Sequence, residues 1–322
     1  MYNVMIFGDV HLYSKNYGSH VNYPQESIDV FRMLTELAKK YSATHMIGLG
    51  DFTMGNIESL RYRSLIEDEL YKQNEITNSN RYELRGNHDF SSSNMTDYEY
   101  YRYWRKLIKY ADYIDVGNTR IHLVSYGDES KNLEMGDKYN IVCAHNYLRF
   151  EDTAMADFYG NSYIKLDDKY NWFGIDCLFC GHIHEEHEFS GLMYSDITKS
   201  NCKEVAVYYP GCPTRPGYKK NLDNQGHAVI LHIDENTEPK IEIVDFDLKP
   251  AEEIFTVSET NMRDVVKIMN QQESINIDDI TDSLCKYNNK FGSIIDAIDS
   301  IEGFSQQAKD KAKSLYMQVL NS

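Results

Sequence analysis

The stretch RYELRGNHD, residues 81–89, joins a short strand-like run to a glycine, an amide, an imidazole and a carboxylate in a row. Four other strand-like runs of the chain end in a similar polar or glycine-bearing corner. They are YNVMIFGD (2–9), THMIGLGD (44–51), YNIVCAH (139–145) and IDCLFCGHIH (175–184). Apolar, β-branched runs bounded by such corners predict strands. The repetition predicts a sheet whose strands deliver polar groups to one edge.

The regions around these runs predict the other elements of the fold. Between the first two runs, residues 25–41 carry apolar side chains at helical spacing, so a strand, a helix and a strand follow one another. After residue 200, the alternating segments 204–210, 226–233 and 240–248 have no helix between them. They predict a second, largely antiparallel sheet. From about residue 258, apolar stripes predict a small helical tail.

Length and composition describe an ordinary globular chain. With 322 residues, 42% of them hydrophobic, it is long enough for one large domain and a small appendage. We expect a catalytic domain over residues 1–250 and a linker plus helical tail over residues 251–322. No signal peptide or membrane-spanning stretch is visible, so we expect no membrane association and a cytoplasmic location in a bacterium or a phage-infected host. The six cysteines predict reduced thiols rather than a disulfide framework.

The net charge of −17 argues against polyanionic partners, because a diffuse negative field repels phosphates. Divalent ions and a local basic strip can invert that field at one cleft. Nucleic acid therefore stays open as a partner if the chain holds metal.

Every corner carries side chains of the types that bind metal ions. In chain order they are Asp9, His11, Asp51, Asn87, His145, His182 and His184. Seven oxygen and nitrogen ligands gathered at one sheet edge suit two ions. Because these seven corner ligands include no thiolate, we expect Mn²⁺, with Fe or Zn as alternatives. Asp51 stands alone in its motif and is the natural bridging ligand. Two bridged ions activate a water molecule and orient a phosphate for in-line displacement.

The ordered set D-x-H, GD, GNHD, AH and GHIH resembles the calcineurin-like metallophosphoesterases over about residues 1–184. The resemblance implies an α/β fold, a four-layered sandwich of two mixed β-sheets flanked by helices. It also implies a ligand set for each ion. The first would be Asp9, His11, Asp51 and His184, and the second Asp51, Asn87, His145 and His182. His88 would be the general acid or charge stabiliser, supported by Asp89. From the sequence of the corner itself, we expect Gly86 to let it turn tightly.

A narrower resemblance lies downstream. Residues 207–233, VYYPGCPTRPGYKKNLDNQGHAVILHI, are similar to the Tyr-x-Gly-Ser-Pro segment of SbcD-type DNA nucleases, with Cys212 in place of the serine. This likeness implies DNA as a partner, together with an SbcC-type coiled-coil ATPase, and it implies a homodimer. One departure is Met54, which stands where many relatives have an Asp or His that orients the catalytic histidine.

Several segments keep two interpretations. Residues 97–115 mix aromatic and basic side chains, which favours either a helix burying Trp104 or a surface that stacks bases. The loop 214–220 carries Arg215, Lys219 and Lys220, either as a DNA backbone strip or as an ordinary solvated loop. The pair Cys177 and Cys180 is interpreted as structural. The tail either shields the core or grips the ATPase.

We therefore expect a metal-dependent phosphodiesterase, a DNA exonuclease or endonuclease subunit in recombination or repair. One alternative is a phosphoesterase for a small nucleotide or a phosphoprotein, which the net charge favours. The other is a scaffold with the same fold and no turnover. The intact ligand set argues against a scaffold.

Overall fold

The computed structural model describes residues 1–16, 20–55, 57–89, 104–150, 163–215 and 225–255. The chain forms two compact units. The larger comprises Met1–Ser14, Pro24–Thr214 and Gln225–Leu248, and the smaller comprises Lys15–Tyr23, Arg215–Asn224 and Lys249–Ser322. Most of the predicted tail, from residue 256 on, lies outside the described residues. The predicted division at residue 250 and the helical tail therefore stay predictions.

The first sheet of the larger unit has five strands in the order β13-β12-β1-β2-β3. Strand β1 (Tyr2–Phe7) runs parallel to β2 (His45–Gly48), which runs parallel to β3 (Arg81–Glu83). On the other side of β1, β12 (Gln225–Ile233) and β13 (Lys240–Asp247) add antiparallel strands. The sheet is therefore mixed, and its parallel strands end at one edge.

The second sheet has six strands in the order β10-β11-β9-β6-β5-β4. Its strands are β4 (Tyr113–Val116), β5 (Thr119–Val124), β6 (Tyr139–His145), β9 (Cys177–Gly181), β10 (His187–Tyr194) and β11 (Cys202–Tyr209). Strands β5, β6, β9 and β11 are parallel, and β4 and β10 close the edges as antiparallel strands. This sheet is mixed as well.

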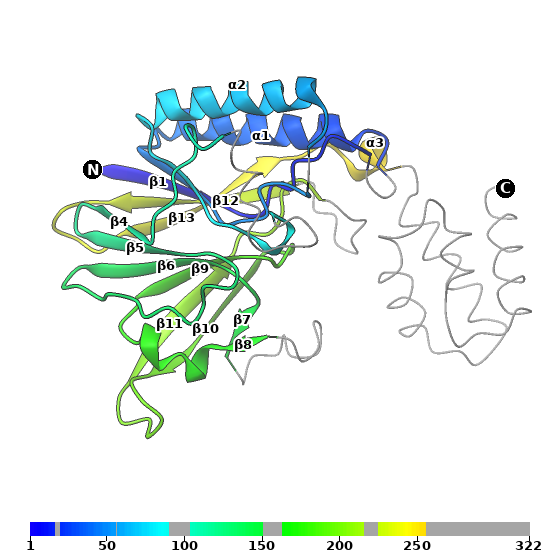
Figure 1. Cartoon of the computed structure of the whole chain (residues 1–322). Helices are drawn as coiled ribbons and strands as arrows, with labels where there is room; N and C mark the ends of the chain where they lie inside the picture. The colour runs from blue at the N-terminus through cyan, green and yellow to red at the C-terminus, as the bar shows by residue number, and fades with distance from the viewer. Residues whose placement is uncertain (17–19, 56, 90–103, 151–162, 216–224, 256–322) are drawn as a thin grey trace, which may run out of the picture. The chain divides into compact units, whose positions relative to one another are not determined.

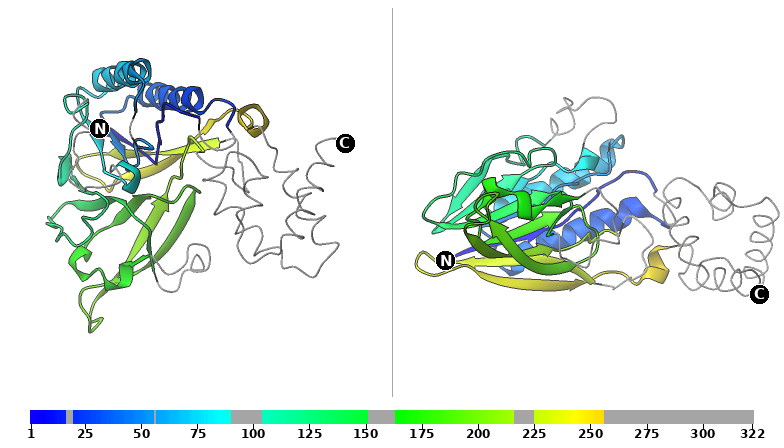
Figure 2. Two further views of the ribbon diagram at one scale, coloured as in Figure 1. Left: turned by 45° about the vertical axis from the view of Figure 1, so that its right-hand side comes forward. Right: turned by 90° about the horizontal axis from the view of Figure 1, so that it is seen from below.

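Two helices cover the outer face of the first sheet (Figure 1). Helix α1 (Tyr23–Lys40) matches the predicted helix, and α2 (Leu60–Ile76) begins at Ser59, whose side chain accepts a hydrogen bond from the Tyr62 N–H. The second sheet packs against the other face of the first sheet, away from the two helices, as the views in Figure 2 also show. Its far face carries the fourth layer. That layer consists of β7 (Leu148–Arg149), β8 (Ile164–Lys165) and the 3₁₀ turns Leu166–Asp168 and Tyr170–Trp172.

Alternating side chains of β1 bind the layers together. Met5 and Phe7 pack beneath the helices, while Val4 and Ile6 pack between the two sheets. All four are fully buried, and burying each apolar side chain stabilises the fold by about 1.5–3 kcal/mol. Because both faces are covered, the strand is apolar from Val4 to Phe7 instead of alternating with polar residues. The four-layered α/β sandwich with two mixed sheets is thus confirmed.

Two local predictions are wrong. The strands after residue 200 do not form a sheet of their own, because β11 joins the second sheet and β12 and β13 extend the first. The stretch 97–115 is not helical at its end, where Tyr113 begins β4; residues 97–103 lie outside the described part. Its apolar residues Trp104 and Ile108 are nevertheless buried, as the helix interpretation required.

The cysteines follow the prediction in the part of the chain that the structure describes. Cys177 and Cys180 are buried on β9, and all five described cysteines are free.

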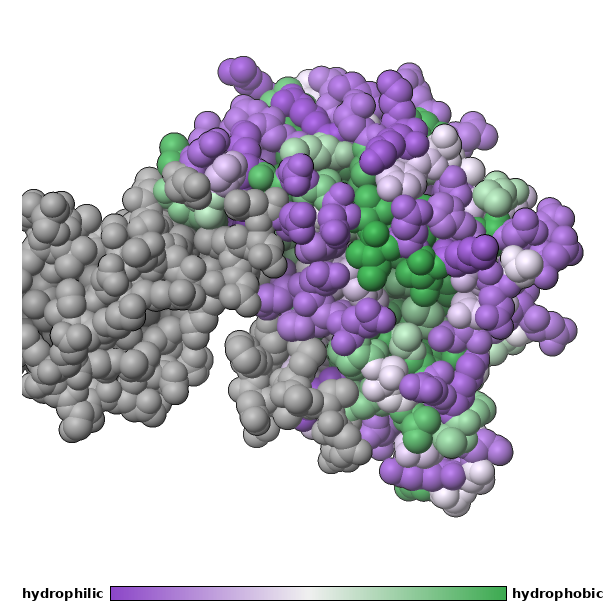
Figure 3. All heavy atoms as spheres, turned by 180° about the vertical axis from the view of Figure 1, so that it is seen from behind, coloured by the Kyte–Doolittle hydropathy of each residue, from purple (hydrophilic) through white to green (hydrophobic). Residues whose placement is uncertain are grey.

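Hydrophobic surface gathers in the middle of the rear face and is bordered by hydrophilic side chains (Figure 3). Ile241 and Ile243 on the edge strand β13 are among the exposed apolar residues. None of the described helices is long and apolar enough to cross a bilayer.

The described part of the smaller unit is built around His20. Its ring packs against the rings of Tyr23 and Phe255, and its Nε2 lies 2.9 Å from the Arg215 carbonyl oxygen. A short helix, α3 (Ala251–Ile254), precedes Phe255, and the Val21 N–H donates to the Ile254 carbonyl. These contacts bring three distant parts of the sequence together within this unit.

Candidate metal centre

The predicted ligands lie where the parallel strands of both sheets end. The first sheet supplies Asp9 and His11 after β1, Asp51 after β2 and Asn87 after β3. The second sheet supplies His145 at the end of β6, and His182 and His184 after β9. All seven predicted ligands are within the described residues, and the contacts below bring them to one place. The candidate centre therefore lies across both sheets.

Three of the predicted ligands have strained backbones. His11 and Asp51 both have φ of 48°, and His182 has φ of 84°, all in the left-handed region that non-glycine residues avoid. That conformation costs about 1–2 kcal/mol for an ordinary residue. Such strain persists only where the surrounding structure enforces it, and it concentrates at functional sites.

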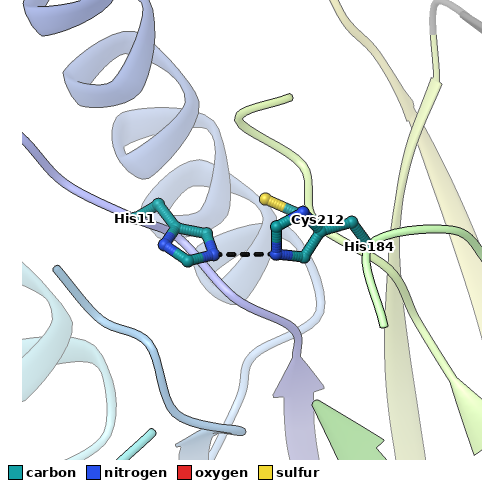
Figure 4. A group of neighbouring side chains, drawn as sticks. All are labelled: His11, His184 and Cys212. Carbon is teal, nitrogen blue, oxygen red and sulfur yellow. Dashed lines mark hydrogen bonds between the residues drawn. The ribbon is translucent and has the colours of Figure 1, made fainter. Parts of the chain in front are cut away.

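The first group of ligands centres on two imidazoles. His11 Nε2 and His184 Nε2 face each other at 3.0 Å (Figure 4). Carboxylates lie on either side, with Asp51 Oδ2 3.7 Å from His11 Nε2 and Asp9 Oδ2 3.8 Å from His184 Nε2. Ligand atoms bound at about 2.0–2.2 Å to one ion are about 3–4 Å apart, so these spacings fit a divalent cation.

The second group centres on Asn87. Its Oδ1 is 3.0 Å from His145 Nε2 and 2.9 Å from His182 Nδ1. The Nδ1 of His145 is 2.7 Å from the Leu49 carbonyl, to which it donates, so Nε2 carries a lone pair. Asn87 Oδ1 and His145 Nε2 are then two acceptors facing each other. That arrangement repels unless both atoms bind the same cation.

Asp51 belongs to both groups. Its Oδ2 is 3.7 Å from His11 Nε2 and 3.5 Å from His145 Nε2, and no described residue gives this oxygen a hydrogen bond. The carboxylate is 1% exposed. Burial raises the pKa of Asp51 well above its ordinary value, and the charges of Asp9 and Asp89 raise it further. A buried carboxylate of this kind needs positive charge beside it.

The imidazoles of the second group are neutral. Burial lowers the pKa of His145 to about 3, with a smaller contribution from His182, and burial also lowers the pKa of His182. Neutral rings offer the lone pair that a metal ligand requires. The donor set therefore fits two divalent ions, and Asp51 is the residue that could serve both.

His88 lies beside the ligands and is held by its backbone. Its N–H donates to Asp51 Oδ1 at 2.8 Å, and its ring contacts that of His11 edge-on at 5.1 Å between centroids. His88 is exposed to solvent, yet the protein around its ring removes part of the hydration of the charged form. This desolvation lowers the pKa of His88. No described residue forms a side-chain hydrogen bond with it, and the effect of Met54 on its orientation stays a prediction.

Asp89 supports the corner rather than the His88 ring. Its Oδ2 accepts a hydrogen bond from the Gly86 N–H at 2.8 Å. Its Oδ1 accepts from the N–H and the hydroxyl of Thr53, at 3.1 and 3.2 Å. The carboxylate thus ties the corner after β3 to the corner after β2, which carries Asp51.

Gly86 is needed for a reason that differs from the predicted one. It does not adopt a positive φ, so a tight turn does not require it. A Cβ at this position would lie 2.0 Å from Asp51 Oδ1 and 2.3 Å from the Asp51 nitrogen. The glycine permits the close approach of the two corners.

A buried ion pair lies next to these corners and is not predicted from the sequence. The Arg81 guanidinium bonds to the Glu83 carboxylate, and both side chains are almost completely buried. Arg81 Nε also donates to Gln73 Oε1 at 2.9 Å, and the guanidinium lies over the Phe7 ring. Burial raises the pKa of Glu83 to about 7, while Arg81 acts in the opposite direction.

Two further residues border the site. The ring of Tyr126 lies 6.3 Å from that of His145 and 6.5 Å from that of His182, centroid to centroid. Cys212 lies within 4.8 Å of His11 and His184, measured between potential ligand atoms. The sequence marks Cys212 only as a substitute for serine, and nothing in it singles out Tyr126.

The structure describes one of the three predicted DNA-contacting residues. Lys219 and Lys220 lie outside the described residues. Arg215 is buried, and its Nη2 donates to the Lys249 carbonyl at 2.8 Å within the smaller unit. The guanidinium of Arg215 thus bonds to the backbone of the same chain. A role of Arg215 in DNA binding stays a prediction.

Comparisons with solved structures show low similarity. Wild-type Vps29 complexed with Zn²⁺, from Entamoeba histolytica, is 15% identical with a TM-score of 0.33, and a double mutant of Vps29 from the same organism is 16% identical with a TM-score of 0.34. Each alignment covers 76% of this chain and 99% of the Vps29 chain. A hypothetical protein from Thermus thermophilus is 13% identical with a TM-score of 0.37, at the same coverage of both chains. No curated protein matches significantly.

The family comparison is more informative. The model of the calcineurin-like phosphoesterase family matches residues 2–186, which is more than half of the chain. That range contains all seven predicted ligands and His88. The chain belongs to the calcineurin-like phosphoesterase family.

Proposed function

We propose that the chain hydrolyses phosphodiester bonds in DNA, as the nuclease subunit of an SbcD-type recombination or repair complex that uses two Mn²⁺ ions. The observation that carries metal-dependent phosphoester hydrolysis is the pair of facing acceptors, Asn87 Oδ1 and His145 Nε2 at 3.0 Å. It is supported by family membership. When bound, two divalent ions supply Lewis acidity at the phosphate and activate water.

We assign the chain's residues as follows. Asp9, His11, Asp51 and His184 would hold the first ion, and Asp51, Asn87, His145 and His182 the second. His88 is not a ligand; its ring would assist departure of the alkoxide, and its backbone bond to Asp51 fixes its position. Asp89 orients the corner that carries both Asn87 and His88.

DNA as the substrate is supported by the sequence of residues 207–233, with its Pro-rich corner and the following basic loop. The same likeness supports a homodimer and an SbcC-type ATPase partner that contacts the tail, whose residues from 256 on lie outside the described part. The net charge of −17 supports a second candidate, a phosphoesterase for a small nucleotide or a phosphoprotein.

Hydrolysis assays separate these candidates. The full chain, stripped of metal and reloaded with Mn²⁺, is incubated with linear double-stranded DNA and separately with bis(p-nitrophenyl) phosphate. We expect cleavage of both, with DNA cleavage increased by an SbcC-type ATPase. Hydrolysis of the small diester alone, with and without the ATPase, would favour the second candidate. No hydrolysis of either substrate by a metal-loaded chain would favour a scaffold.

The role of His88 is tested by its alanine variant. His88→Ala should reduce turnover by about 10²–10⁴-fold while two metals still bind, because the backbone bond to Asp51 does not depend on the ring. His232→Gln on β12 is the matched control, since His232 bonds to Asn3 and Glu242 outside the site. Loss of metal in His88→Ala would show that His88 is a ligand.

A further inference from the structure

Cys212 is held beside the first group of ligands by the backbone. The chain leaves β11 and turns at Gly211, whose φ is 76°. The Cys212 N–H then donates to the His184 carbonyl at 3.0 Å. A Cβ on Gly211 would lie 2.9 Å from that same carbonyl oxygen. The corner carrying Cys212 is therefore packed tightly against the corner that carries His184.

The thiol side chain points into the same region as the two imidazoles. Its Sγ and the ligand nitrogens of His11 and His184 all lie within 4.8 Å of one another (Figure 4). A metal bound at about 2.3 Å from sulfur and 2.0–2.1 Å from nitrogen separates those atoms by at most about 4.4 Å. A small side-chain adjustment therefore brings all three within reach of one ion. Cys212 is 7% exposed, so water does not compete freely for the sulfur.

A second observation points to a cation at this place. Asp51 is 1% exposed, and its Oδ2 has no hydrogen-bond partner among the described residues while lying 3.7 Å from His11 Nε2. The group Asp9, His11 and Asp51 is also close enough to bind one ion. His11 thus belongs both to the group that contains the thiol and to a group that contains a buried carboxylate in need of positive charge.

We propose that the Cys212 thiolate is a ligand of the first metal ion and shifts this position from Mn²⁺ toward Zn²⁺ or Co²⁺. The proposal rests on the metal centre of the proposed function and deepens it. On binding, the sulfur–metal bond forms and the thiol proton passes to solvent. Soft thiolate ligands favour Zn²⁺ and Co²⁺ over Mn²⁺, which prefers oxygen. The two metal positions of this chain would therefore select different ions.

Cobalt spectroscopy tests the proposal without any assay of turnover. The full chain is stripped of metal under reducing conditions and titrated with Co²⁺. We expect visible Co²⁺ bands, together with a near-ultraviolet thiolate-to-cobalt charge-transfer band that saturates at one equivalent. Cys212→Ser should lose the charge-transfer band and keep the visible bands. Cys202→Ser, which removes an exposed cysteine on β11, is the matched control and should change neither.

Competition binding gives a second readout. The preference for Zn²⁺ over Mn²⁺ at the first position should fall by at least about tenfold in Cys212→Ser. Visible Co²⁺ bands without a charge-transfer band in the parent chain, or a band that persists in Cys212→Ser, would overturn the proposal and leave the metal centre intact. Failure of the parent chain to bind Co²⁺ at all would overturn both.

Discussion

The backbone N–H of His88 donates a 2.8 Å hydrogen bond to Oδ1 of Asp51, which fixes the proposed catalytic residue to the proposed bridging ligand. The other oxygen, Oδ2, faces His11 and His145. One carboxylate oxygen therefore positions the corner after β3, and the other is directed at the metal positions. A substitution that removes the charge but keeps the oxygen should affect metal binding and folding in opposite directions.

Asp51→Asn should separate these two effects. In the metal-free chain, burial and the nearby charges of Asp9 and Asp89 raise the pKa of Asp51, so a neutral amide should raise the melting temperature measured in EDTA. Metal affinity should fall by more than the 10–100-fold typical for loss of an outer partner, because a bridging ligand is lost. Thermal unfolding with and without Mn²⁺ measures both. A lower melting temperature in EDTA would contradict the assignment.

Gly86→Ala should disrupt the centre while leaving the core intact. Its Cβ would collide with Asp51 Oδ1 and with the Asp51 nitrogen, forcing the corners after β2 and β3 apart. We expect loss of metal binding by calorimetry, with near-normal circular dichroism. Gly136→Ala is the matched control, because the nearest atom to a Cβ there is 3.8 Å away. If Gly86→Ala binds metal as tightly as the parent chain, the close approach of Gly86 to Asp51 is not what requires a glycine at this position.

Glu83→Ala should be strongly destabilising. It leaves the buried Arg81 guanidinium without its carboxylate, which typically costs about 3–5 kcal/mol. Asp115→Ala removes the partner of Arg120 in a more exposed ion pair and should cost no more than about 1 kcal/mol. Urea unfolding of both variants measures the difference. If the two variants lose the same free energy of unfolding, other groups in the protein stabilise the charge of Arg81 when Glu83 is absent.

His20 should make the smaller unit less stable in mild acid. Burial lowers the pKa of His20 to about 4, below its ordinary value of 6.5, because a protonated Nδ1 would be a buried donor without an acceptor among the described residues. Between pH 6.5 and 4 the unfolded form binds the proton and the folded form does not. Stability is therefore complete above pH 6.5 and falls as the pH drops toward 4.

His20→Phe should reduce that loss, since an apolar ring can pack against Tyr23 and Phe255 without titrating. Unfolding monitored from pH 7 to pH 4 compares the two proteins, and NMR titration of the His20 ring gives its pKa directly. A His20 pKa near 6.5 in the folded protein would contradict the prediction.

The strands and the ligand corners could be predicted because each signal is local. Asp9, Asp51 and His145 each follow an apolar run, and the ends of parallel strands meet at one sheet edge. Helix α2 was harder to predict, since its buried face includes Glu69 and Gln73, which weakens the apolar periodicity.

The remaining differences arise from pairings and burial that only the complete fold decides. Strands β12 and β13 alternate as antiparallel strands do, but their sequence does not say that β12 pairs with β1. Nor does it show that Cys212 packs against the corner of His184, or that Arg81 and Glu83 form a buried pair. The strand pairing, the packing of Cys212 and the burial of the ion pair all depend on which segments the complete fold brings together.

The placement of the ligands on both sheets has a mechanical consequence. Asp9, His11, Asp51 and Asn87 come from the first sheet, whereas His145, His182 and His184 come from the second. Two ions held by this set would cross-link the sheets at one end, above the apolar layer that includes Val4, Ile6 and Phe179. Metal binding would then stiffen one edge of the sandwich, and removal of the ions by a chelator would lower the melting temperature of the folded chain.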